Sequence, residues 1–158
     1  MLRCAALVLA AILGIAPAAA AEPGEPGLQI WVNPGMFSHH EKDDREYRKK
    51  NYGFGVEAFF TPRHGILAGS ILNSNDERSR YLGYHWRPLQ LPLGGLRLSG
   101  GLAFALIDGY SDVREGGTFP IVLPALSAEY WRLGVHLIYL PNPEHSSAIA
   151  LQFRLRVW

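Results

Sequence analysis

The sequence predicts an all-β protein, an eight-stranded antiparallel up-and-down β-barrel of the outer-membrane type. Three observations predict it. The segment 148–158 alternates apolar and polar residues with a period of two and ends on Trp158, as is typical of the last strand of such barrels. Other alternating segments are separated by turn residues, with short and long connections in turn. No apolar run reaches the roughly 20 residues of a membrane-spanning helix.

The first 21 residues predict a secretory signal peptide whose removal leaves one barrel domain, 22–158. Arg3 gives a positive start, 4–15 is apolar, and 18–21 supplies small residues for cleavage. The alternative is a buried N-terminal helix. Cys4 is the single cysteine and leaves with the signal, so no thiol remains for a disulfide, a cysteine–metal site or a nucleophile.

The charge of the chain is nearly balanced, with 15 basic and 14 acidic residues. No basic face points to nucleic acid, so we expect no nucleic-acid partner. The one dense run of charges, 41–50, mixes both signs and is predicted to be a solvated loop.

The first four predicted strands are bounded by turn residues. They cover 28–40, 52–60, 66–74 and 79–87. Asn33-Pro34-Gly35 interrupts the first strand. The second alternates aromatic and aliphatic residues with glycines and Glu57, which places its apolar residues on one face. Residues 61–65 and 75–78 supply the turns on either side of the third strand.

The last four predicted strands follow a looser connection, 88–95. They cover 96–107, 118–130, 133–140 and 148–158. The fifth has leucines on one face and small residues on the other. The pair Trp131-Arg132 is a tight turn between the sixth and seventh strands. In the last strand the polar face carries Gln152, Arg154 and Arg156, which we expect to line a polar lumen.

A barrel that crosses a membrane must be closed, because lipid cannot satisfy an open sheet edge. Tight connections follow the second, fourth and sixth strands, so the longer loops are predicted at the cell surface. Aromatic residues near strand ends suit an interfacial girdle. They are Trp31, Phe37, Phe59, Phe60, Tyr84, Trp86, Phe119, Tyr130, Trp131 and Tyr139. A soluble, lipocalin-like periplasmic barrel is the alternative that alternation allows.

Two polar groups are predicted at one rim of the barrel. Ser38-His39-His40 ends the first strand and Asn73-Ser74 ends the third. A histidine beside a serine at a membrane rim can act as a general base for acyl transfer, with a polar neighbour orienting it or holding an oxyanion.

Metal binding is not predicted. His39 and His40 are adjacent on a strand and point to opposite faces, so they cannot chelate together. There is no cysteine and no third ligand at a suitable spacing, and we expect neither a metal nor a cofactor. The other histidines are expected in loops or at strand ends. They are His64, His85, His136 and His145.

Several motifs resemble the lipid A palmitoyltransferase family, over most of the mature chain. The motifs are 64–69, 73–74 and 82–88 in the centre, then 119–130, 139–141 and the final strand. The resemblance implies an eight-stranded outer-membrane barrel. It implies an activity that moves an acyl chain from the sn-1 position of a glycerophospholipid to lipid A. We therefore expect a monomer in the outer membrane with these two lipids as partners.

The resemblance also implies roles for individual residues. The catalytic histidine of the family matches His40 when the sequences are aligned on Ser38, and His39 when they are aligned on Pro34; His40 is preferred. An Asp-Ser pair matches Asn73-Ser74, with Asn in place of Asp. Lateral gates for lipid are marked by prolines, which match Pro34, Pro124 and Pro141.

Two departures bear on the activity. The amphipathic helix at the N-terminus of the family is missing, since 21–27 is a short Pro/Gly segment. The small residue at the floor of the family's acyl pocket matches His85, which would shorten or polarise the pocket. Charged residues of the last strand leave room for an acyl slot only in the outer half. A non-enzymatic barrel, structural or binding a solute or lipid, is therefore the alternative function.

Overall fold

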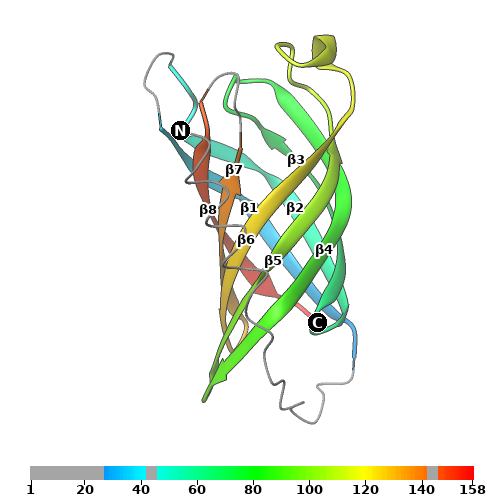
Figure 1. Ribbon diagram of the computed structural model, residues 1–158, viewed down its shortest axis with the longest axis vertical. Helices are drawn as coiled ribbons and strands as arrows, with labels where there is room; N and C mark the ends of the chain where they lie inside the picture. Colours follow the sequence, from blue (N-terminus) through cyan, green and yellow to red (C-terminus); the bar gives the residue numbers. More distant parts are fainter. Residues whose placement is uncertain (1–26, 42–45, 142–145) are drawn as a thin grey trace, which may run out of the picture.

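The computed structural model describes residues 27–41, 46–141 and 146–158, which form a closed antiparallel barrel with its strands in chain order (Figure 1). The strands are β1 Gln29–His40, β2 Lys50–Thr61, β3 His64–Leu72, β4 Arg78–Leu93, β5 Leu96–Ile107, β6 Phe119–Tyr130, β7 Leu133–Leu140 and β8 Ala148–Arg156. β1 pairs with β8 and closes the sheet. The predicted fold class is confirmed. The predicted signal peptide, 1–21, lies outside the described residues.

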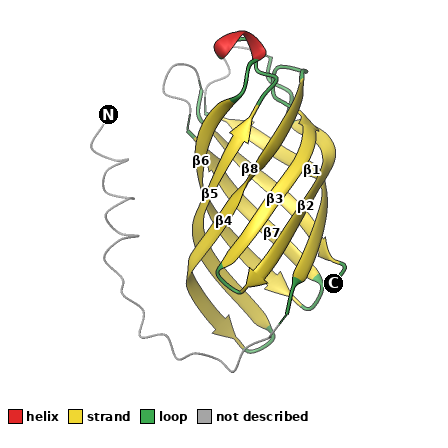
Figure 2. Ribbon diagram, turned by 90° about the vertical axis from the view of Figure 1, so that its right-hand side faces the viewer, coloured by secondary structure: helices red, strands yellow, loops and turns green. Residues whose placement is uncertain are grey.

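The two ends of the barrel differ in the length of their connections. Pairs of residues at 62–63, 94–95 and 131–132 join strands at one end, called here the short-turn end. The longer connections 73–77 and 108–118 lie at the opposite, long-loop end, where Figure 2 shows the 3-10 helix η1, Arg114–Gly116. The tight turn after β4 uses Gly94 at φ +61°, a left-handed conformation that glycine adopts without steric cost.

The segment 88–95 is not a loose connection, because β4 continues to Leu93 and pairs with β5 over that stretch. The register shifts between Trp86 and Leu89, and Pro88 falls in this irregularity. β3 pairs with β4 only as far as Trp86. Beyond that point β4 has a free edge on one side, where prolines remove no ladder hydrogen bond.

The outward face of the barrel is apolar over most of its height. Large apolar side chains project from every strand, and Phe54, Leu82 and Phe153 are more than half exposed. Polar side chains instead lie inside, where Glu57, Glu129 and other charged groups are buried. This distribution is the reverse of a soluble lipocalin-like barrel, whose outer face is polar and whose core is apolar.

In the described parts of the chain, no helix is long and apolar enough to cross a bilayer.

A cluster of buried charges fills the interior near the short-turn end. The carboxylate of Glu129 accepts hydrogen bonds from the guanidinium groups of Arg87 and Arg154. Nη1 of Arg154 also lies 3.4 Å from Oε2 of Glu57. Two buried carboxylates thus face two buried guanidinium groups, which compensates the cost of removing each charge from water. Arg154 lies inside, as the alternation of the last strand predicts.

Two aromatic residues predicted for the interfacial girdle are instead inside the barrel. Trp31 and Phe59 are 0% and 1% exposed. Their rings lie against the buried arginines: Cζ of Arg87 is 3.6 Å from the Phe59 ring centroid, and Cζ of Arg154 is 4.3 Å from that of Trp31. The desolvated guanidinium groups hold both rings inside through cation–π contacts, which were not visible as a sequence pattern.

Replacing Arg154 by methionine should destabilise the barrel by about 3–5 kcal/mol, because buried Glu57 loses its guanidinium partner and buried Glu129 loses one of its own. The measurement is the free energy of unfolding in urea for the protein in detergent micelles. Arg80→Met is the matched control, since Arg80 pairs with Asp108 in solvent, with 77% of its side chain exposed. Equal unfolding midpoints for the two variants would show that the interior cluster contributes no more than a surface pair.

Candidate functional site

An interior cavity of about 380 Å³ occupies the part of the barrel toward the long-loop end. Its wall is mostly aliphatic. The apolar lining includes Leu67, Ile71, Ala103, Ala105, Ile107, Ile121, Leu123, Ala125, Ile138 and Leu140. On β2 the lining runs from Asn51 to Glu57, six residues or about 20 Å along a strand. With strands tilted by about 40°, this is a slot about 15 Å deep along the barrel axis.

His40 and Ser74 both line the outer part of this slot. His40 is the last residue of β1; it is 8% exposed and stacks on Tyr47, with ring centroids 4.0 Å apart and planes 9° apart. Ser74 follows β3 by two residues, and its carbonyl oxygen accepts the Arg48 N–H at 2.9 Å. His39 is exposed on the outer face of β1. Two neighbouring histidines thus point to opposite sides of the wall, as strand geometry requires.

Asn73 has no free hydrogen-bonding capacity. Its Oδ1 accepts the N–H groups of Asn75 and Glu77 at 2.9 and 3.0 Å. Its Nδ2 donates to the Gly109 carbonyl at 2.7 Å and to Ser79 Oγ at 3.0 Å. These local bonds end β3 at Leu72 rather than at the predicted residue 74, since the side chain competes with the ladder. Asn73 is fully buried, does not line the slot and fixes the loop that carries Ser74.

A second amide at the rim was missed by the sequence motifs. Asn51 Oδ1 accepts the Ser38 hydroxyl at 2.7 Å, and Asn51 Nδ2 donates to the Leu72 carbonyl at 3.0 Å. Asn51 therefore ties together the rim ends of β1, β2 and β3. It borders the charged run of the sequence, and only strand pairing shows that it faces inward.

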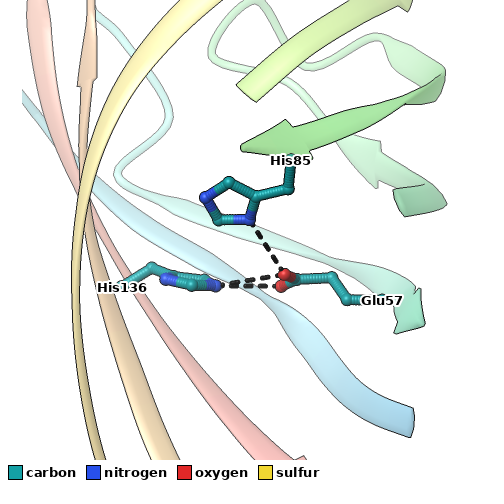
Figure 3. Close-up of side chains that lie close together, drawn as sticks. All are labelled: Glu57, His85 and His136. Atoms are coloured by element: carbon teal, nitrogen blue, oxygen red, sulfur yellow. Dashed lines mark hydrogen bonds and ion pairs between the residues drawn. The ribbon is translucent and has the colours of Figure 1, made fainter. Parts of the chain in front are cut away.

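The inner end of the slot is polar and centred on Glu57, whose carboxylate accepts hydrogen bonds from two histidines (Figure 3). His136 Nε2 lies 3.0 Å from Oε1, and His85 Nδ1 lies 3.2 Å from Oε2. The Ser127 hydroxyl lies 2.7 Å from His136 Nδ1. An ionised carboxylate can only accept, so both histidines donate to it, and the Ser127 hydroxyl donates to His136 Nδ1.

Two of the four remaining histidines are therefore not in the loops or at the strand ends that their scatter along the sequence predicts, although the resemblance matches His85 to the floor of a pocket. His85 and His136 are buried within strands rather than in loops or at strand ends. His64 does begin β3, and His145 lies outside the described residues. The partners of Glu57 are 28 and 79 positions away along the chain. Only closure of the barrel brings them together, so no spacing motif could have found them.

The same three side chains place one potential ligand atom each within 4.8 Å of the others, close enough to hold a metal ion. Such a trio was not anticipated from spacing. The surroundings disfavour a dication, because Arg154 Nη1 already lies 3.4 Å from Oε2 of Glu57. The nearby buried carboxylate of Glu129 is likewise shared between Arg87 and Arg154. A divalent cation would add charge that no further buried carboxylate among the described residues balances.

Strand pairing is interrupted at two seams beside the slot. β6 pairs with β7 only from Ala125 to Tyr130, whereas its outer part, 119–124, pairs with β5 alone. Pro124 lies at this transition. Between β1 and β8 the pairing stops after Val32 and resumes at Phe37, and Pro34 lies in the gap. Pro141 directly follows β7 at the long-loop end. The three prolines that the sequence singles out thus border breaks in the hydrogen-bonded wall.

These features define a class of protein: a closed eight-stranded barrel that holds an apolar slot, with a histidine and a serine at its mouth. No family model matches the chain. The chain is similar to the protein named Lipid A acyltransferase PagP of Laribacter hongkongensis (strain HLHK9), with 26% identity over 125 residues. The match covers 75% of this chain and 58% of that protein. It confirms the resemblance that the sequence motifs indicate.

The slot is expected to bind an alkyl chain, and Ala105→Phe should abolish this binding. Ala105 faces inward and lines the slot, so a phenyl ring there would occupy the space that the chain needs. Binding of a spin-labelled or isotopically labelled alkyl probe by the purified barrel measures this. Ala68→Phe places the same ring on the outer face of β3, where Ala68 is exposed. Equal probe binding by both variants would contradict occupancy of the slot.

Proposed function

We propose that this chain is an outer-membrane acyltransferase that moves an acyl chain from a glycerophospholipid to lipid A. The observation that carries the proposal is the apolar slot inside the barrel, which opens where His40 and Ser74 lie. A slot closed off from the outer face of the wall suits a single aliphatic chain better than an aqueous pore. The name of the similar Laribacter protein supports lipid A as the acceptor.

The surface of the barrel supports a place in a lipid bilayer. The outward side chains form an apolar band around the wall, and the charges outside the band sit at its ends: Arg63 and Arg132 by the short turns, Arg78 and Arg80 by the long loops. Every strand pairs with two neighbours over part of its length, and the breaks in pairing are confined to the two seams and the extension of β4. The longer loops would face outward from the cell, as they do in barrels of this class. We take the chain to act as a monomer.

The chemistry assigns His40 the part of general base. His40 takes the proton from a hydroxyl of the acceptor, whose oxygen attacks the carbonyl carbon of the sn-1 ester. A new ester bond forms, the bond to the glycerol oxygen breaks, and the proton returns from His40 to that oxygen, which leaves as lysophospholipid. Tyr47, stacked on the imidazole, holds the orientation of the ring.

Ser74 and Asn73 have different parts in this scheme. The Ser74 hydroxyl lines the slot and is available to bind the acceptor hydroxyl or the ester carbonyl. Asn73 is a positioning residue, because all its polar atoms already bind the loop. An amide stands here where the family has a carboxylate, and Tyr47 is one side chain that orients the His40 ring. No covalent acyl-enzyme is required.

The two seams are the routes by which lipid would reach the slot. A proline has no N–H to pair with a neighbouring strand, so the wall lacks a backbone hydrogen bond at Pro34 and at Pro124. Pro141 ends β7 beside the wider of the two seams. One seam would admit the donor chain and the other the acceptor, both directly from the membrane.

The rival function is a barrel that binds a lipid or solute without chemistry. The polar inner end of the slot favours it, because buried Glu57, His85 and His136 restrict the depth available to a long chain. Measurement of acyl transfer to lipid A separates the two functions.

His40→Ala should lower the rate of acyl transfer by at least about 100-fold, the usual contribution of a positioned general base. The measurement is the added acyl mass on lipid A, by mass spectrometry, after incubation with phospholipid in detergent. His39→Ala is the control, since His39 faces away from the slot and should leave the rate unchanged. Transfer that is absent from the unmodified protein, or unaffected by His40→Ala, would favour the non-enzymatic barrel.

His85→Ala should shift the preferred donor toward longer acyl chains. The smaller side chain deepens the slot, and each added methylene that becomes buried contributes about 0.8 kcal/mol. Competition between phospholipids with dodecanoyl and hexadecanoyl chains measures the shift as a ratio of products. His64→Ala, at the start of β3 and outside the slot, should leave that ratio as it is. An unchanged ratio in His85→Ala would remove His85 from the floor of the slot.

A further inference from the structure

One polar atom at the inner end of the slot has no partner in the barrel and no part in the proposed chemistry. Nε2 of His85 is buried without a hydrogen-bond partner among the described residues, and His85 as a whole is 2% exposed. The residue lines the slot, and its second nitrogen faces away from Glu57 (Figure 3). Buried polar atoms normally have a partner, and the residue that carries this one lines the cavity, so a group that arrives with a ligand could supply the missing partner.

The hydrogen bonds around Glu57 fix what that atom can do. His85 Nδ1 lies 3.2 Å from the carboxylate and carries the proton, which leaves Nε2 with a lone pair. His136 offers no such atom, because its Nε2 binds Glu57 and its Nδ1 binds Ser127 at 2.7 Å. His85, at the floor of the slot, therefore carries a fixed hydrogen-bond acceptor.

A metal ion does not explain the orphan atom. An ion held by this cluster would bind Nδ1 of His85 and Nε2 of His136, the atoms that face Glu57. Nε2 of His85 would stay unpaired on the opposite side of its ring. The missing partner is a donor that enters through the slot.

We infer that the slot takes an aliphatic chain bearing a hydroxyl group at its inner end, which donates to Nε2 of His85. The amide of Gln152, which also lines the inner end, is suited to donate to the oxygen of the same hydroxyl. That this chain is the acyl group of a donor phospholipid rests on the proposed function.

The depth of the slot sets where the hydroxyl belongs on the chain. From the level of Asn51 to that of Glu57 the slot is about 15 Å deep along the axis. An extended chain advances about 1.2 Å per bond, so the hydroxyl lies about twelve bonds from the ester. A 12-hydroxydodecanoyl chain fits, and a hydroxyl close to the ester would remain at the rim.

The test compares two free acids, 12-hydroxydodecanoic acid and dodecanoic acid, for binding to the purified full chain in detergent. The ratio of the affinity for the hydroxylated acid to the affinity for dodecanoic acid should be about five-fold higher in the unmodified protein than in His85→Phe. This is the usual contribution of one hydrogen bond. Comparing proteins cancels the different partition of the two acids into micelles. His85→Gln keeps an acceptor and should retain part of the preference, and His64→Phe should retain all of it.

An equal preference for the hydroxylated acid in the unmodified protein and in His85→Phe would overturn the inference. So would the result that His85→Gln and His85→Phe no longer bind either acid. A second arm uses phospholipids with the same two chains at sn-1 and measures transfer to lipid A. If the acids bind with the expected preference but neither chain is transferred, the hydroxyl site stands and the proposed function fails. If both acids bind equally well and both chains are transferred equally well, the proposed function stands and the hydroxyl site fails.

Discussion

The buried ion cluster around Arg154 is the interaction on which the rest of the barrel depends. A wall whose outward face is apolar has its buried polar side chains inside, and near the short-turn end these are charged. Arg154 contacts both Glu57 and Glu129, and Arg87 completes the set. Buried charges are tolerated only when they are paired and hydrogen-bonded. The strands β2, β4, β6 and β8 that supply these groups are thereby held at one level.

The position of this cluster determines where a ligand can bind. Charges and the rings of Trp31 and Phe59 fill one part of the lumen. The cavity lies toward the other end, where the lining turns to alanine, leucine and isoleucine. Glu57 belongs to both regions, since it pairs with Arg154 on one side and receives His85 and His136 on the other. The floor of the slot is thus held in place by the same interactions that stabilise the barrel.

The mouth of the slot depends on different forces. His40 is held by stacking on Tyr47, and Asn51 and Asn73 join strands and loops through their amides. The seam at Pro124 leaves 119–124 of β6 paired with β5 alone on the side of the mouth, whereas the seam at Pro34 lies opposite 152–154 of β8, nearer the floor. The ion-paired base therefore carries a mouth at which β6 has fewer backbone hydrogen bonds.

The sequence by itself determined the strand order, the inward or outward direction of most side chains, the charged lumen and the resemblance that singled out His40, Ser74 and the prolines. Period-two alternation carries this information locally, because each residue's direction follows from its neighbours. Tertiary structure alone decided that Trp31 and Phe59 lie inside and that Glu57 binds His85 and His136. It also decided that the side chain of Asn73 forms all its hydrogen bonds within the loops around it. Apart from the local bonds of Asn73 to Asn75, Glu77 and Ser79, these contacts connect residues tens of positions apart, and they exist only because the sheet closes on itself.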